Sequence, residues 1–188
     1  MLLSTTERSN LFFSADTHFS QERTRKLSRR PFADINAMDL AMVERWNSKV
    51  QPDDTVIHVG DFGHYPMVSK LNGNIILLAG NYERKDMKNG LISKDYLLGL
   101  GFKEVYLEEK SLTVSLEGTT VELVHEPSHA KTRHFKLFGH IHKLQMVKRN
   151  ALNVGVDCHD FAPISLREVF MLKEAIEKHF DNEVFMTL

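Results

Sequence analysis

The sequence has a single cysteine, Cys158, and no surplus of either charge. One cysteine rules out an intramolecular disulfide and is compatible with a reducing cytosol. The 24 Lys and Arg and the 25 Asp and Glu give a net charge of −1, so the chain as a whole attracts neither nucleic acid nor an anionic membrane. An anionic partner must therefore be held by local positive charge or by metal.

Long apolar runs, repeats and linkers are also missing. No run approaches the roughly 20 residues that a membrane span needs, and residues 1–10 have no basic and then apolar signal pattern. No repeat, low-complexity segment or linker divides the 188 residues, of which 42% are hydrophobic. The sequence therefore predicts a single domain over residues 1–188 and a soluble, cytoplasmic protein without a membrane partner.

Apolar runs that end at polar residues organise the chain. The central one, residues 56–59, stops at Gly60 and delivers the carboxylate of Asp61. Other runs end in the same way, at Asp16 and His18, at Asn81, at His125, and at His140 and His142. Carboxylate, imidazole and amide ligands without a thiolate suit two borderline-to-hard divalent ions that share a carboxylate. The repeated pattern predicts a metal site.

The first half of the chain has an α/β pattern. We expect strands at 10–15, 55–60 and 74–79, and a short helix at 66–71. A longer helix is expected from Asp34, as N-cap, to Val50, with Leu40 in its apolar stripe. A strand, a helix and a second strand joined by short turns predict a right-handed parallel crossover.

The second half favours antiparallel pairing. A helix at 93–100 is followed by strand-like runs at 103–107, 111–116 and 119–124, and further strands are expected at 135–138, 144–148 and 151–154. Ser165 and Glu168 have the spacing of a capping box that opens a last helix. Residues 181–188 add an edge strand or fray.

The order of the polar residues resembles the calcineurin-like metallophosphoesterase superfamily, from about Leu11 to Val169 and most closely its short bacterial and phage-type members. The resemblance rests on Asp16-x-His18, Gly60-Asp61, Gly80-Asn81, His125 and Gly139-His140-x-His142 as a set. It implies an α/β fold, a four-layer αββα sandwich of two mixed β-sheets flanked by helices.

The resemblance also implies a dinuclear centre. It places Asp16, His18 and His142 on one ion, Asn81, His125 and His140 on the other, and Asp61 between them as the bridging catalytic carboxylate. In an extended backbone, residues two apart share a face, so Asp16 and His18 could grip one ion. Extended His140 and His142 would be near 7 Å apart and could serve different ions.

The ligand types leave Mn, Fe, Zn, Ni and Mg open, and we favour manganese. Any one histidine beside a strand is more often a core or surface residue than a ligand, and only the matched set reverses that preference. His58 is expected in the core or behind the ligands. Cys158 is expected to be a buried small residue rather than a nucleophile.

The sequence departs from the family after Asn81, where Tyr82 replaces the usual histidine. Tyrosine is a poor proton donor at neutral pH, so either Tyr82 positions the substrate, another group such as His64 or His159 supplies the acid, or the protein is slow. Some branches without this histidine resemble phosphodiesterases more than monoesterases. That comparison favours a phosphodiesterase here.

Basic residues offer candidate phosphate contacts. Arg30 and Arg84 are the substrate-binding candidates, with Arg23, Arg29 and Lys85 nearby, although a solvated surface charge is the simpler interpretation of each. We expect a metal-dependent phosphoesterase that uses a hydroxide held between two ions, with a phosphate ester, such as a nucleotide, as partner. A silent scaffold on the same fold is one alternative. A nuclease is another, and would need a local basic groove.

Overall fold

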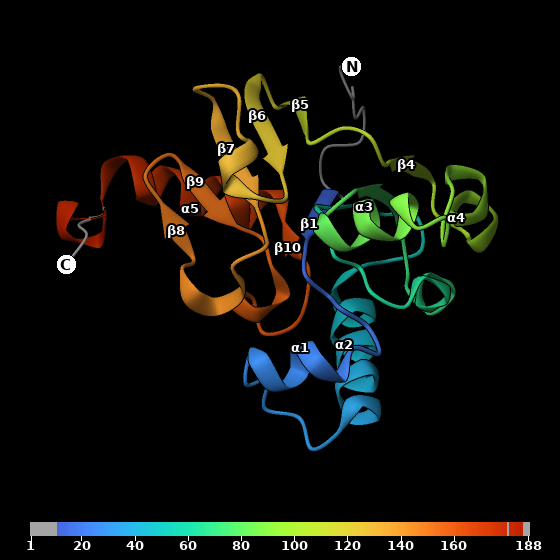
Figure 1. Cartoon of the computed structure of the whole chain (residues 1–188). Coiled ribbons are helices and arrows are strands. Elements are labelled where there is room, and N and C mark those ends of the chain that lie inside the picture. The colour runs from blue at the N-terminus through green and yellow to red at the C-terminus, as the bar shows by residue number, and fades with distance from the viewer. Residues whose placement is uncertain (1–10, 180, 186–188) are drawn as a thin grey trace.

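The computed structural model describes residues 11–179 and 181–185 (Figure 1). The helices are α1 (Glu22–Leu27), α2 (Ile35–Lys49), α3 (Asn81–Lys88), α4 (Lys94–Leu100) and α5 (Leu166–Lys178). The strands are β1 (Leu11–Ser14), β2 (Thr55–His58), β3 (Asn74–Leu78), β4 (Glu104–Tyr106), β5 (Ser111–Leu116), β6 (Thr119–Val124), β7 (Phe135–Phe138), β8 (Val147–Lys148), β9 (Ala151–Asn153) and β10 (Ile164–Ser165). Short 3-10 turns connect several of them, including Tyr65–Lys70 and Asn182–Phe185.

The first sheet has the order β10-β1-β2-β3-β4. Strands β1 to β4 run parallel, with Phe13, Ile57 and Ile76 in register, and β10 pairs antiparallel with β1. The connection from β1 to β2 passes through α2, as a parallel pair requires. The parallel crossover expected from the sequence is confirmed, and the carboxyl ends of β1, β2 and β3 lie at one edge of the sheet.

The second sheet has the order β5-β6-β7-β9-β8. The β5–β6 hairpin is antiparallel, as is the β8–β9 pair, whereas β6, β7 and β9 are parallel to one another. Both sheets are therefore mixed. Figure 1 shows the second sheet in yellow and orange, beside the first.

Side chains alternate between two cores. Leu11, Phe13 and Ile57 of the first sheet join Val121 and Leu137 of the second in a buried cluster between the sheets, which α5 also contacts. On the other face of the first sheet, α2 and α4 cover β2 and β3, through a cluster that contains Met38, Met42, Trp46, Val56, Leu77 and Leu97. Two mixed sheets flanked by helices match the expected fold class. None of the helices in the described part of the chain is long and apolar enough to cross a membrane.

Several elements match their expected positions. Asp34 accepts a hydrogen bond from the Ala37 amide as N-cap of α2, and Ser165 and Glu168 form the capping box of α5. Leu40, expected in the buried stripe of α2, is 61% exposed. Met38, Met42 and Trp46 form that stripe without it, since position 40 lies off the three- and four-residue spacing of the buried face.

Other expectations were wrong. Residues 104–106 form β4, which pairs parallel to β3 instead of joining an antiparallel group. The strand expected at 144–148 shrinks to Val147–Lys148, because His142–Leu144 form a 3-10 turn. The helix α3 had not been expected at all. The tail includes a 3-10 turn at Asn182–Phe185, and the rest of the strand-or-fray expectation, residues 186–188, lies outside the described residues.

Candidate metal centre

The candidate ligands follow the carboxyl ends of strands in both sheets. Asp16 follows β1, Asp61 follows β2, and Asn81 begins α3 directly after β3. In the second sheet, His125 follows β6 and His140 follows β7, with His142 two residues later. Because β1, β2 and β3 are mutually parallel, as are β6 and β7, these ends converge where the two sheets meet. The structure brings all seven residues together.

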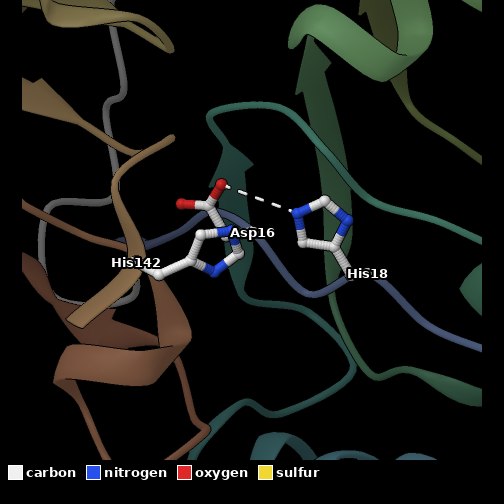
Figure 2. A group of neighbouring side chains, drawn as sticks. All are labelled: Asp16, His18 and His142. Atoms are coloured by element: carbon white, nitrogen blue, oxygen red, sulfur yellow. Dashed lines mark ion pairs between the residues drawn. The ribbon is translucent and has the colours of Figure 1, made fainter. Parts of the chain in front are cut away.

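Asp16, His18 and His142 form the first cluster (Figure 2). Each offers one ligand atom, and these atoms lie within 4.8 Å of one another. His18 Nε2 is 3.9 Å from Asp16 Oδ1, and the rings of His18 and His142 stack with centroids 5.1 Å apart. One carboxylate and two imidazoles thus point at a common centre.

Asp61, His125 and His140 form the second cluster, with ligand atoms again within 4.8 Å. His125 Nε2 lies 3.3 Å from Asp61 Oδ2. The amide oxygen of Asn81 is 3.1 Å from His125 Nε2 and 3.0 Å from His140 Nδ1. Asn81 therefore adds a neutral oxygen to this cluster.

Asp61 lies between the clusters. Its Oδ2 is 3.5 Å from His18 Nε2 of the first cluster as well as 3.3 Å from His125 Nε2 of the second. Its other oxygen, Oδ1, accepts a hydrogen bond of 2.9 Å from the backbone amide of Tyr82. This bond fixes the carboxylate plane while Oδ2 faces both groups.

Hydrogen bonds select the histidine tautomers. Nδ1 of His125 donates to the carbonyl of Val59 at 2.8 Å, and Nδ1 of His142 donates to Asp157 at 2.9 Å. In His18, Nδ1 is 2.7 Å from the side-chain oxygen of Gln21. A proton on Nδ1 leaves the lone pair of Nε2 free for a ligand bond. His18 Nε2 is buried without a hydrogen-bond partner, which fits a metal ligand.

The electrostatics of the site favour positive charge. Burial, opposed in part by His125 and His142, raises the pKa of Asp16 to about 6. Burial acts the same way on Asp61, but the hydrogen bond and charge of His125 outweigh it and lower the pKa of Asp61 to about 2. Burial would lower the pKa of His125, and Asp61 instead raises it to about 9. Two buried carboxylates this close stabilise cations between them.

The backbone at the site is unusual. Asp16, His18, Asp61, His140 and His142 all have positive φ, between 49° and 73°. Non-glycine residues rarely adopt this left-handed conformation, and such residues concentrate at functional sites. The expectation of extended pairs at Asp16/His18 and His140/His142 was therefore wrong. A sharp turn at each residue, rather than a shared strand face, aims these side chains.

Glu83 is a residue that the sequence argument missed. Its buried carboxylate accepts hydrogen bonds from the amides of Asp61, Phe62 and Gly80, at 2.7, 2.9 and 2.8 Å. Burial and the nearby Asp61 raise its pKa to about 7. Glu83 thereby ties the loop after β2 to the start of α3. The available signal was a glutamate three residues after the N-cap Gly80, a spacing at which its carboxylate can accept the N-cap amide as in one half of a capping box.

Close approach also explains two glycines at the site. A Cβ on Gly80 would overlap the carboxylate of Asp61, and one on Gly139 would overlap that of Asp16. His140, next to Gly139, donates its backbone amide to both Asp16 oxygens, at 3.0 and 2.8 Å. Only glycine lets these loops pack directly against the carboxylates.

Arg30 does not face a substrate. Its guanidinium is buried and forms a bidentate ion pair with Asp157, at 3.0 and 2.7 Å. It also donates to the carbonyls of Thr17 and Asp16, at 2.8 and 2.6 Å. The expectation of a phosphate contact was wrong, because all these donors are already used. Arg30 holds Asp157, and Asp157 in turn orients His142.

Arg84 is likewise committed elsewhere. It donates to the Ala79 carbonyl and forms an ion pair with Glu126, so the expected phosphate contact was wrong for this residue too. It is not among the residues that line the cavity at the site. Although Arg84 lies close to the ligands in the sequence, its guanidinium donates to a nearby backbone carbonyl and to a carboxylate of a neighbouring loop instead of facing the cavity.

An open cavity of about 610 Å³ lies over both clusters. His18, Asp61, Asn81, His140 and His142 are among its lining residues. Its other lining residues are Arg23, Thr24, Leu27, Ser28, Arg29, Tyr82, Ile141, Lys143 and Leu144. A bound molecule can therefore reach the candidate ligands from solvent.

Tyr82 lines this cavity, with its ring at 5.0 Å and edge-on to that of His18. Its hydroxyl accepts a hydrogen bond of 3.4 Å from Arg23. His64 and His159, the alternative acids, do not line the cavity. His159 Nε2 instead lies 2.7 Å from the Asn153 carbonyl. Of the three, only Tyr82 is placed to touch a bound molecule.

His58 has the structural role expected of it, whereas Cys158, which was expected to be buried, is only partly buried. His58 is fully buried behind the ligands, 3.1 Å from the Thr17 hydroxyl, and burial lowers its pKa to about 3. The Cys158 thiol is 3.4 Å from the carbonyl of His142, and burial raises its pKa to about 12. Neither is a ligand candidate in the clusters.

Comparisons with known proteins found one matching family model and several similar chains. The family model described as "Calcineurin-like phosphoesterase superfamily domain" matches residues 10–161. An uncharacterized protein of Methanocaldococcus jannaschii is 26% identical over 172 residues, covering 87% of this chain and 91% of that protein. The crystal structure of a protein of unknown function from Aquifex aeolicus has a TM-score of 0.65 at 21% identity, covering 86% of this chain and 98% of that one. A structure described as a novel archaeal phosphodiesterase has a TM-score of 0.45 at 21% identity, over 77% and 81%.

Proposed function

Because the chain belongs to the calcineurin-like phosphoesterase superfamily, we propose that it is a phosphodiesterase that works with two divalent metal ions. The observation that supports this most directly is the position of Asp61. Its Oδ2 is 3.5 Å from His18 Nε2 and 3.3 Å from His125 Nε2, which belong to different clusters. A carboxylate shared in this way is what a dinuclear site requires.

The seven residues divide between the two ions by cluster. Asp16, His18 and His142 would hold one, Asn81, His125 and His140 the other, and Asp61 would bridge them. Two divalent ions in this position would supply Lewis acidity, both lowering the pKa of water and neutralising phosphoryl oxygens. The donor set of imidazole, carboxylate and amide admits Mn, Fe, Zn, Ni and Mg, and manganese is the metal we propose among them.

The protein's own part is to fix the ligands in place. Val59 and Asp157 select the Nδ1-protonated tautomers of His125 and His142, so that Nε2 faces the site. Glu83 holds three backbone amides of the loops that carry Asp61 and Asn81. Such outer contacts limit the reorganisation of the ligands during a reaction.

Tyr82 supports a diester as the substrate. Hydrolysis of either a monoester or a diester releases an alkoxide that benefits from a proton donor, and a phenol is a weaker acid than an imidazolium ion, so acidity alone does not separate the two substrates. Superfamily branches without a histidine at this position resemble phosphodiesterases, and this resemblance favours the diester. Tyr82 follows Asn81 directly and lines the cavity, whereas His64 and His159 do not line it. We assign Tyr82 the role of positioning the ester. The substrate we propose is a phosphodiester, with a nucleotide as the leading candidate.

The test is to compare bis-p-nitrophenyl phosphate with p-nitrophenyl phosphate. Metal-stripped protein receives manganese, nickel, zinc or magnesium in turn, and the metal content of each sample is measured. We expect turnover only with metal, faster for the diester, and fastest with manganese. A protein that binds about two ions per chain yet hydrolyses neither ester would contradict the proposal and favour a scaffold.

A further inference from the structure

The mouth of the cavity is basic. Arg23 lies on α1, Arg29 follows that helix, and Lys143 belongs to the 3-10 turn on the opposite wall. All three line the cavity and are exposed. Lys143 Nζ donates to the Arg29 carbonyl at 3.4 Å, so the two walls meet at this point. Three positive charges thus surround the entrance to the candidate metal centre.

No carboxylate of the described residues neutralises these three charges, although Arg23 donates to the Tyr82 hydroxyl and Lys143 to the Arg29 carbonyl. On the same helix, Arg25 and Lys26 pair with Glu22. Across residues 11–179 and 181–185, neither Arg23, Arg29 nor Lys143 forms an ion pair with a carboxylate. Among the described residues that line the cavity, Asp61 at its floor is the only acidic one. The mouth is therefore free to receive an anion.

The mouth of the cavity also has apolar side chains next to the three basic residues. Leu27 and Leu144 line the cavity and are 69% and 87% exposed. Ile141 and the ring of Tyr82 continue this apolar surface toward the ligands. A single exposed leucine is ordinary, but two on facing walls of one cavity form a surface that a flat apolar group can cover.

From this mouth we infer that the substrate carries a second anionic group and a flat apolar group in addition to the ester that is cleaved. The inference rests on the proposed phosphodiesterase. A diester phosphate has one negative charge, which two divalent ions at the floor would already neutralise, so three further cations exceed its need. Guanidinium groups match phosphate oxygens, and leucine and tyrosine side chains pack on ring faces. A nucleoside with a second phosphate combines these features.

Two esters test this directly. Thymidine 5′-(p-nitrophenyl phosphate) and thymidine 3′-phosphate 5′-(p-nitrophenyl phosphate) both release p-nitrophenol, which is measured, and they differ only in the second phosphate. With the metal-loaded protein at low salt, we expect kcat/KM to be roughly tenfold higher for the second ester, mainly through KM. Added salt should reduce this ratio, because it screens exposed charges.

Charge variants identify the residues responsible. Replacing Arg23, Arg29 and Lys143 together by glutamine should bring the ratio close to one. The control is Lys26→Gln on the same helix, where Lys26 is exposed, pairs with Glu22 and does not line the cavity. This control should keep the ratio of the unmodified protein. A triple variant that also keeps that ratio would overturn the role of the three cations.

The apolar part has its own comparison. Leu27→Ser combined with Leu144→Ser should raise KM for the thymidine esters several-fold, roughly the effect of losing one partly buried side-chain contact. Leu91→Ser is the control, because Leu91 is 67% exposed but is not a lining residue. If both variants bind the thymidine esters alike, the apolar subsite is refuted.

A strand of nucleic acid and a free nucleotide both supply a second phosphate. A short single-stranded oligonucleotide with the same reactive end separates them, because added phosphates increase kcat/KM only if the natural source is a strand. Equal kcat/KM for both lengths assigns a mononucleotide. Either result keeps the requirement for a second anionic group.

The inference and the proposed function can fail separately. If all the diesters are hydrolysed with metal but the second phosphate gives no advantage, the inference fails and the phosphodiesterase remains. If nothing is hydrolysed, the phosphodiesterase fails, and calorimetry decides the inference by itself. Thymidine 3′,5′-bisphosphate should then bind the metal-loaded protein more tightly than thymidine 5′-monophosphate, and equal affinity would overturn the inference.

Discussion

The ion pair between Arg30 and Asp157 connects the segment before α2 to the candidate metal centre, and Arg30→Met tests its contribution to stability. The two side chains are 0% and 1% exposed. Arg30 also donates to the carbonyls of Thr17 and Asp16. Methionine keeps the length of the side chain and suits the neighbouring Met38 and Met42, but it donates no hydrogen bond.

The expected loss is large because Asp157 stays buried after the substitution. Removing one partner of a buried ion pair costs about 3–5 kcal/mol. A protein of this length loses about 2–4 °C in Tm for each kcal/mol. The product of the two is a fall in Tm of roughly 6–20 °C. His142 remains beside Asp157 at 2.9 Å, so the lower half of the range is the more realistic expectation.

Thermal unfolding followed by circular dichroism measures the change, and Arg45→Met is the matched control. Arg45 pairs with Asp160, three residues after Asp157, but these side chains are 39% and 87% exposed. An exposed pair contributes about 1 kcal/mol or less, so the control should lose a few degrees at most. Equal losses in the two variants would refute the argument that burial makes the Arg30 pair important.

The same pair predicts a dependence on pH. Burial would raise the pKa of Asp157, but its hydrogen bonds with His142 and Arg30 lower it instead. A carboxyl with a lowered pKa contributes stability that is complete above its unfolded pKa near 3.9 and is lost as the pH falls through the folded value. The difference in Tm between the unmodified protein and Arg30→Met should therefore narrow in acid. A constant difference down to pH 3 would contradict this assignment.

Further predictions concern the centre itself. Asp61→Asn should remove most of the bound metal from both positions and lower diester turnover by about 100-fold or more, since a neutral amide bridges cations poorly. Asparagine tolerates the positive φ of 60° at this position, so the fold should persist, and metal analysis beside the exposed control Asp95→Asn decides. Tyr82→His should lower turnover of the diester, because Tyr82 is assigned to position the ester, whereas faster hydrolysis of an alkyl monoester such as thymidine 5′-monophosphate, whose alkoxide leaving group needs a proton, would mean that a missing acid was limiting. Cys158 should react slowly with iodoacetamide at pH 8 until the protein is denatured, because burial raises the pKa of its thiol to about 12, and fast labelling in the folded state, detected by mass spectrometry, would be inconsistent with that.

Local patterns predicted those elements whose causes are local. The helix from Ile35 to Lys49 has an N-cap at Asp34 and a regular buried stripe, and both are visible in the sequence. The branched apolar runs of β2 and β3 are covered on both faces, as parallel strands are. These elements were placed to within one or two residues. The parallel pairing of β1 with β2 followed from the intervening helix α2.

The sequence predicted a strand at 103–107 but could not predict its parallel pairing as β4 or the presence of α3. Glu104–Tyr106 is three residues long, and its parallel pairing with β3 depends on how α3 and α4 return the chain. The α3 sequence from Asn81 to Lys88 is almost wholly polar, and Glu83 is its buried residue. Hydrophobic periodicity has no signal in such a helix. Its stability comes from the hydrogen bonds of Glu83 to backbone amides.

The candidate ligands were predictable by type and order, whereas the surrounding residues were not. Arg30 and Asp157 are 127 positions apart, and nothing local distinguishes an arginine in a buried pair from one that meets a phosphate. Arg23 and Arg29 lie in the same basic stretch as Arg25 and Lys26, yet only Arg25 and Lys26 form ion pairs with Glu22. Which cation is free depends on which face of a short helix lies against the cavity.

The sequence predicted candidate ligands that the structure brings together, although it assumed an extended backbone for some of them. The residues with positive φ at the site explain how both can be true. An extended strand would place Asp16 and His18 on one face, and that spacing matches the family motif, but both residues have positive φ. Each turn costs of order 1 kcal/mol or more, so contacts around it must compensate. The amide of His140 bonded to Asp16 and the amides bonded to Glu83 provide such contacts. The backbone strain is located at the candidate ligands, and the hydrogen bonds that offset its energetic cost come from residues far away in the sequence. The identity of the candidate ligands could therefore be inferred from the sequence, but their backbone geometry could not.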